Sequence, residues 1–239
     1  MTVPGKGAGN VNVLVRYCEE FGWSFLQTKR NRLALAQNLV IRHHASAKYI
    51  YKLDEDIFVG EGYFEGLREA YEYAKDESEY DPGIVVPLLN VNGYTYRRFL
   101  EKMDLLEEYE KQFGKALCKC MNIPAHGEGA SAVYLWEKSI PFDEVVNKMK
   151  EDKTIISVCP HRFSIGAIFM LRQMWYEIGG FWTEGDAVLG REEEILCNYC
   201  MNSSKVIIVA NKIFAGHFAF GPQKKEMKRF FDENRSRFD

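Results

Sequence analysis

Apolar residues in the first fifty positions recur first with the period of a helix and then with that of a strand. Residues 10–21 and 33–47 place apolar side chains three and four positions apart, which predicts two amphipathic helices. Residues 24–28 form a short apolar run, and residues 48–53 form an aromatic and aliphatic run that ends in three acids. The pattern therefore predicts a strand after each helix.

The same alternation continues along the rest of the chain. Residues 63–73 predict another helix, and residues 84–89, which follow an Asp-Pro-Gly turn, predict a buried strand. Farther on, residues 165–172 predict a strand, 192–201 a helix and 205–208 a β-branched strand. Strands that alternate with helices indicate an α/β fold with a central mixed sheet flanked by helices.

Two segments stand outside this alternation. Residues 91–157 contain a charged helical stretch at 99–121 and a glycine-rich loop at 126–130, and we interpret them as an insertion that shapes a binding site. Residues 224–239 predict a basic, amphipathic C-terminal helix. Without repeats or low-complexity linkers, we expect one domain over residues 1–239.

The composition is that of an ordinary globular protein and narrows the classes of partner. A formal net charge of −3 provides no basic field of the kind that attracts nucleic acid, so we expect no nucleic-acid partner. No run of 18 apolar residues and no secretory leader pattern occurs in the sequence, which predicts a cytoplasmic location. In that compartment the six cysteines are interpreted as reduced thiols.

Three consecutive acids, Asp54, Glu55 and Asp56, follow the strand predicted at residues 48–53. Ligands of open α/β sheets bind beyond the carboxyl ends of strands. Alternate side chains of an extended chain point the same way, so Asp54 and Asp56 can converge on one hard cation while Glu55 turns aside. We predict Mn²⁺ or Mg²⁺, with diphosphate oxygens filling its open positions. A D-x-D sequence alone is most often a solvated acidic loop, so the surrounding sequence must show whether these acids bind a cation.

In context, the chain resembles the glycosyltransferases of the Rossmann-related GT-A fold, especially the large inverting group called family two, over residues 10–217. The block at 30–38 is similar to that family's asparagine-bearing helix, and the block at 47–56 is similar to its strand and D-x-D motif. The resemblance implies that Asn31 and Asn38 lie near the donor nucleotide.

The second half of the chain carries the later blocks of the same resemblance. Gly166 lies in a segment similar to the one that flanks the donor sugar, and a Gly-Arg-Glu-Glu-Glu sequence from Gly190 resembles the family's G-x-E-D helix start. The resemblance implies that Glu193, with Glu192 as the alternative, is the base that deprotonates the acceptor hydroxyl, and that Arg191 belongs to the donor site. A triple Glu read alone indicates only charge at a helix N-terminus.

A histidine and several aromatic residues complete the set of candidates. His217 follows the last predicted strand, where the resemblance implies a third ligand of the metal. Trp182 offers a face on which an acceptor can stack, although core packing is the ordinary role of such a residue. Tyr96 and Arg97, within the insertion, are predicted to contact the acceptor.

The sequence departs from the family pattern in two places. The chain begins at what resembles the family's second helix, so the first strand is predicted to be missing. The family's Glu-Asp pair is Glu192-Glu193 here, which lengthens the proposed base by one methylene group.

The predicted function is transfer of a hexose from a nucleotide sugar, UDP-linked, to a hydroxyl of a glycan or lipid-linked acceptor with inversion, as in polysaccharide biosynthesis. One alternative is a noncatalytic descendant that binds sugar nucleotides. Another is a Mg²⁺-dependent phosphotransferase of the haloacid-dehalogenase type, with Asp54 as nucleophile. The basic tail is consistent either with a solvated helix or with peripheral contact to an anionic membrane surface.

Overall fold

The structure, a computed structural model, describes residues 2–4, 8–29, 32–119, 122–183, 190–218 and 221–238. The chain forms two compact units. The first consists of Met1–Ile50 and Leu171–Leu196, and the second consists of Tyr51–Met170 and Cys197–Asp239. Among the described residues, no helix is both long enough and apolar enough to cross a membrane.

The first unit contains a short parallel sheet and three helices, with the start of a fourth. Its elements are β1 (Thr2–Pro4), α1 (Ala8–Glu20), β2 (Leu26–Thr28), α2 (Leu33–His43), α9 (Arg172–Glu177) and the first turns of α10 (Arg191–Asn202). β1 pairs in parallel with β2. A strand therefore precedes the first helix, where the sequence pattern predicts none; its three residues are too short a run for hydrophobic periodicity to reveal.

Two buried polar side chains hold α2 and α9 together. The guanidinium of Arg172, which is only 8% exposed, donates to the carbonyl oxygens of Ala47 (2.6 Å), Ile41 (2.5 Å) and His44. Asn38 Oδ1 accepts hydrogen bonds from Trp175 Nε1 and from the backbone amide of Phe181, which follows α9. Because buried polar groups are costly unless paired, these bonds fix one arrangement of α2 and α9.

The second unit is built on a six-stranded mixed sheet in the order β3-β7-β5-β8-β4, with β6 paired to β8. The strands are β3 (Tyr49–Leu53), β4 (Ile57–Val59), β5 (Pro82–Leu89), β6 (Ile156–Cys159), β7 (Ala167–Leu171) and β8 (Val206–His217). β5 runs parallel to β8 and antiparallel to β7. Every residue of β5 is buried, as expected of a strand covered on both faces. The prediction of an α/β protein with a mixed sheet is confirmed.

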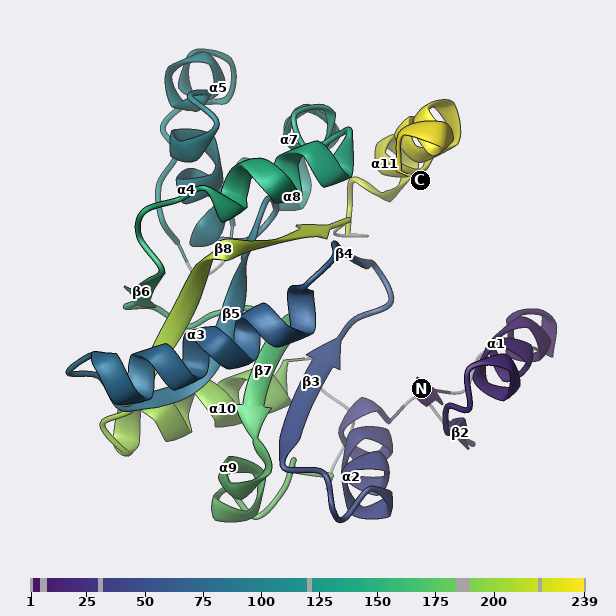
Figure 1. The fold of residues 1–239 in the computed structure, drawn as a ribbon. Coiled ribbons are helices and arrows are strands. Elements are labelled where there is room, and N and C mark those ends of the chain that lie inside the picture. The colour runs from purple at the N-terminus through teal and green to yellow at the C-terminus, as the bar shows by residue number, and fades with distance from the viewer. Residues whose placement is uncertain are drawn as a thin grey trace. The chain divides into compact units, whose positions relative to one another are not determined.

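Helices cover both faces of the sheet at β8. The helices of this unit are α3 (Tyr63–Glu77), α4 (Thr95–Lys102), α5 (Leu106–Phe113), α6 (Pro124–Gly127), α7 (Gly129–Glu137), α8 (Phe142–Lys150) and α11 (Lys224–Asn234), followed by the 3₁₀ turn Arg235–Arg237. Figure 1 shows α3 crossing the sheet, while α4, α7 and α8 gather together above β8. Alternation along β8 explains this, because Ile213 faces Gly66 of α3 whereas Phe214 stacks on Phe99 of α4.

Several boundaries differ from those predicted, each for a local reason. The helical stretch predicted at 99–121 is two helices, because Asp104 adopts a φ of +59° between α4 and α5. The glycine-rich loop predicted at 126–130 is helical, as α6 and α7. Short strands β4 and β6 form through pairing with β8, a long-range contact that local sequence pattern does not encode.

Candidate metal and donor site

Strand register places His217 beside the acidic turn. β3 ends at Leu53, and a turn follows in which the amide of Ile57 donates to the Asp54 carbonyl at 3.3 Å. β4 then pairs antiparallel with the end of β8, with Ile57 opposite His217. The amide of Phe218 donates to the Asp56 carbonyl at 2.9 Å, which secures the pairing. Residues 161 positions apart in the chain are thereby brought into contact.

His217 and Asp56 face one another across a short gap. His217 Nε2 lies 3.5 Å from Asp56 Oδ2, and the two side chains are 17% and 13% exposed. His217 Nδ1 lies 3.0 Å from the Val91 carbonyl oxygen, which can only accept a hydrogen bond, so Nδ1 carries the proton. In a neutral imidazole, Nε2 then has a lone pair that faces a carboxylate oxygen. This is the tautomer that ligates metals through Nε2.

The charge on Asp56 acts on the histidine when no cation separates the two groups. Burial lowers the pKa of His217, but the hydrogen bond and charge of Asp56, with the Val91 carbonyl, outweigh it and leave the pKa above its ordinary value. Asp56 therefore favours the protonated form of His217. A divalent cation and this proton would compete for the same position.

Asp54, directly after β3, is held by a lysine of that strand. Lys52 Nζ lies 2.6 Å from Asp54 Oδ1 and donates to the Ile165 carbonyl at 2.7 Å. Burial raises the pKa of Asp54, and the positive charge of Lys52 opposes this only in part. Glu55 between the two aspartates is exposed. Within the described ranges, no group of three or more His, Cys, Asp or Glu side chains is arranged to hold a metal ion.

Gly166 leaves a space between the acid turn and the histidine. Its carbonyl accepts a hydrogen bond from the Asp54 amide at 2.8 Å. A Cβ atom at this position would lie 3.4 Å from Asp54 Oδ2 and 3.9 Å from His217 Cε1. A methyl group would thus occupy the space that these two side chains border, without overlapping either. The donor set of carboxylates and one imidazole suits Mn²⁺ or Mg²⁺, with Lys52 already neutralising one carboxylate.

The residues predicted as the base lie in the first unit. α10 begins after Gly190, whose φ is +89°, and carries Glu192 and Glu193 in its first turn. Glu192 is 7% exposed and Glu193 is partly buried. In the same unit, the Arg191 guanidinium lies 5.9 Å from the centre of the Trp182 ring, which is 57% exposed. Arg191 and Trp182 thus form one contiguous exposed surface.

Of the two asparagines predicted near the nucleotide, Asn38 lies within the described residues. Asn31 lies outside the described residues. Asn38 is 5% exposed, and its Nδ2 donates to the Phe181 carbonyl at 2.7 Å while its Oδ1 accepts from Trp175 and from the Phe181 amide. Its amide supports the turn after α9.

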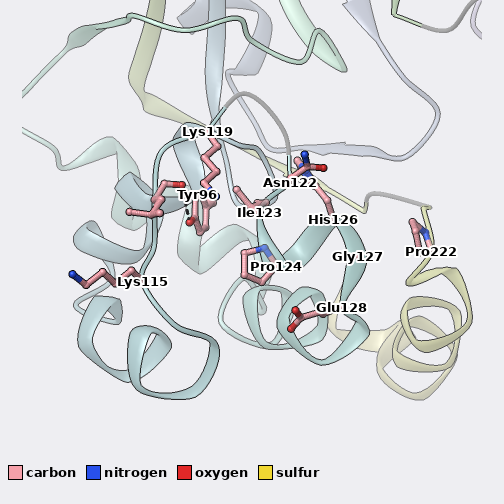
Figure 2. Close-up of a pocket in the computed structure, with 11 residues that line it drawn as sticks. Tyr96, Lys115, Lys119, Asn122, Ile123, Pro124, His126, Gly127, Glu128 and Pro222 are labelled. Carbon is pink, nitrogen blue, oxygen red and sulfur yellow. Dashed lines mark hydrogen bonds between the residues drawn. The ribbon is translucent and has the colours of Figure 1, made fainter.

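A cavity of about 470 Å³ lies in the second unit, among residues of the 91–157 segment. It is lined by Tyr96, Lys115, Leu117, Lys119, Asn122, Ile123, Pro124, His126, Gly127, Glu128 and Pro222. Figure 2 shows that the ammonium end of Lys115 points away from the other labelled residues. Burial and the charge of His217 lower the pKa of His126 to about 4, so the His126 imidazole is uncharged at neutral pH and interacts electrostatically with His217.

Of the two insertion residues predicted to contact an acceptor, Tyr96 lines the cavity and Arg97 does not. Tyr96 is fully buried, and its hydroxyl donates to the Leu117 carbonyl at 3.0 Å. Arg97 donates through Nε to Glu101 and through a terminal nitrogen to the Ala116 carbonyl. Tyr96 and Arg97 therefore both hold the backbone at residues 116 and 117, and Leu117 lines the cavity.

Sequence reasoning missed Lys52, Asn90 and His126. Lys52 has a sequence signal, since it lies two positions before Asp54. Asn90 and His126 meet the site only through contacts between distant segments, so no local pattern marks them.

No model of a known protein family matches the chain, and no curated protein matches it at a significant level. Function is therefore inferred from the side chains and their geometry.

Proposed function

We propose that the protein is a metal-dependent glycosyltransferase that transfers a sugar from a nucleoside diphosphate donor to a hydroxyl group with inversion. The observation that carries the proposal is the approach of His217 Nε2 to Asp56 Oδ2 at 3.5 Å, just beyond the carboxyl end of β3, with Nδ1 bound to the Val91 carbonyl. A GT-A fold, with the D-x-D motif at the end of its strand, is part of the same proposal.

In this function Asp56 and His217 hold the cation, and Asp54 completes the acidic border of the site. The cation, when bound, neutralises the diphosphate as it leaves. Lys52 fixes Asp54 by its hydrogen bond, so the carboxylate borders the Gly166 space with its second oxygen, Oδ2. Gly166 keeps that space open for the donor, because a side chain there would fill it.

Proton transfer and acceptor binding are assigned to other residues. Glu193, with Glu192 as the alternative, takes the proton of the acceptor hydroxyl, and Arg191 and Trp182 offer a cation and a ring face for a sugar. The cavity beside His126 offers an acceptor site with amide, carboxylate and ammonium groups from Asn122, Glu128 and Lys119. A cytoplasmic location, with the basic helix α11 at a membrane surface, stays a prediction.

The decisive experiment is calorimetric titration of UDP with and without Mn²⁺, on the wild type and on Asp56→Asn and His217→Gln. We expect Mn²⁺-dependent binding that falls by about 100-fold or more in either variant, since each removes one of the few ligands. Glu61→Gln, which neutralises an exposed acid shortly after the turn, is the matched control and should bind as the wild type does.

Turnover separates the enzyme from the two alternatives. Release of UDP from a panel of UDP-sugars, with the anomeric configuration of the product read by NMR, is expected of a transferase. Metal-dependent UDP binding without release would identify a noncatalytic descendant. Hydrolysis of a generic phosphate ester, abolished by Asp54→Asn, would replace the transferase with a phosphotransferase.

A further inference from the structure

Asn90 is a fully buried amide at the end of β5 that contacts the segment carrying His217. Its Oδ1 accepts hydrogen bonds from the His217 amide at 2.9 Å and from the Val91 amide at 2.8 Å. Its Nδ2 donates to Ser139 Oγ at 2.9 Å, and that hydroxyl donates in turn to the Leu135 carbonyl. Asn90 is 0% exposed and thus joins the ends of β5, β8 and α7.

These bonds fix the histidine at both of its ends. The His217 amide is bound by Asn90, its carbonyl accepts from Trp136 Nε1 at 2.9 Å, and its ring Nδ1 donates to the Val91 carbonyl at 3.0 Å. Asn90 also binds the amide of Val91, so the same side chain orients the residue that selects the tautomer of the ring. With the backbone and Nδ1 fixed, Nε2 points at Asp56.

Few other side chains can replace this amide. The site requires one oxygen that accepts from two backbone amides and one group that donates to a hydroxyl, with no net charge. An aspartate would lack the donor and add a negative charge close to Asp54 and Asp56, and a leucine would leave two buried amides unpaired.

We propose that Asn90 is a positioning residue that sets the orientation and tautomer of His217, so that Nε2 faces Asp56 and a divalent cation can bind between them. This rests on the proposed function for the role of the cation, but the orientation of the imidazole does not depend on it.

The test compares Asn90→Ala and the milder Asn90→Ser with Asn211→Ala. Asn211 is equally buried, lies on β8 six residues before His217, and bonds Arg98 and Ser157 instead. Mn²⁺ alone is titrated and followed by electron paramagnetic resonance. We expect about a 10-fold or greater loss of Mn²⁺ affinity in the Asn90 variants, as for other residues that orient a metal ligand, and a change within about twofold in Asn211→Ala.

A second measurement reads the imidazole directly. Long-range ¹⁵N–¹H NMR at pH 9, assigned with His217→Gln, should show the Nδ1–H tautomer in the wild type and in Asn211→Ala, and a mixture of tautomers in Asn90→Ser. Unchanged tautomer in the Asn90 variants would overturn the proposal. Failure of the wild type to bind Mn²⁺ would instead contradict the proposed function, and the tautomer comparison would still decide the role of Asn90.

Discussion

Gly166 shows how a residue without a side chain defines the candidate site. The space that its missing Cβ leaves is bordered by Asp54, directly after β3, and by His217, the last residue of β8. The contacts that a methyl group would make, at 3.4 Å or more, are ordinary van der Waals distances. Alanine should therefore fit the fold but compete with a ligand.

Substitution of Gly166 by alanine is expected to lower the affinity for UDP and Mn²⁺ by about 10-fold while changing the free energy of unfolding by less than about 1 kcal/mol. Gly127→Ala, where a Cβ would meet no atom within 4 Å, is the control for an added methyl group. Calorimetry and urea unfolding measure the two effects. Equal affinities for the two variants would show that the space beside Asp54 is not used.

His126 provides a pH prediction, because its folded pKa of about 4 lies below the ordinary value of 6.5. Between these values the unfolded chain binds more protons than the folded one, so stability rises with pH and is lost as the pH falls from 6.5 towards 4. Partial exposure weakens the effect to about 2 kcal/mol over this window. His126→Gln should flatten that part of the stability profile, measured by urea unfolding at successive pH values. The exposed His161→Gln should leave it unchanged, and a His126→Gln profile that matches the wild type would contradict the assignment.

At this scale, the sequence predicted three residues that the structure brings close together. Asp54 and Asp56 were selected by their place after a strand and His217 by the family resemblance, and all three border one space. The supporting groups were not predictable, because the Asn90 and Val91 contacts to His217 arise from sheet register. Burial of Tyr96 likewise depends on how α4 packs.

Among the elements, β8 pairs with three other strands and carries a residue of the candidate site. It pairs with β4, β5 and β6 and ends at His217. Only its first residues were predicted, because Asn211 and Lys212 interrupt the apolar run. The polar interruption is tolerated since Arg98 and Ser157 both donate to the buried Asn211 oxygen. The local hydrophobic pattern does not predict these hydrogen-bond partners, because they come from distant segments of the chain.

The packing of β8 on α7 predicts a sharp intolerance at Gly216. A Cβ there would lie 2.4 Å from the Trp136 ring, so Gly216→Ala should destabilise the protein by about 2 kcal/mol. The smaller ring of Trp136→Phe should relieve the overlap, and the cost of Gly216→Ala should fall in that background. A double-mutant cycle by chemical denaturation measures the coupling. Strictly additive costs would argue against this contact.

For the whole molecule, the division into two units predicts unequal local stability. The second unit contains the six-stranded sheet and a large aromatic core around Trp136, whereas the first has a two-stranded sheet of three-residue strands. Because the free energy of opening follows the local amount of buried apolar contact, amides of α1 and α2 should exchange faster than those of β5.

Native-state hydrogen exchange measures this, and we expect protection in β5 to approach that of global unfolding while α1 and α2 exchange at least about 100-fold faster. Asn38→Ala, which removes the amide between α2 and the turn after α9, should accelerate exchange in the first unit and leave β5 unchanged. Equal acceleration in both units would mean that the chain opens as one cooperative body.

The pairing of Lys52 with Asp54 bears on the stability of the protein when no cation is bound. Lys52 pairs with Asp54 and His217 lies against Asp56, so each aspartate has a partner on the chain before any ion binds. The protein would then fold before it binds the cation. The cation would be an exchangeable ligand and not a structural metal. Dialysis against a chelator should abolish UDP binding yet leave the melting temperature within about 2 °C, and readdition of Mn²⁺ should restore binding in full.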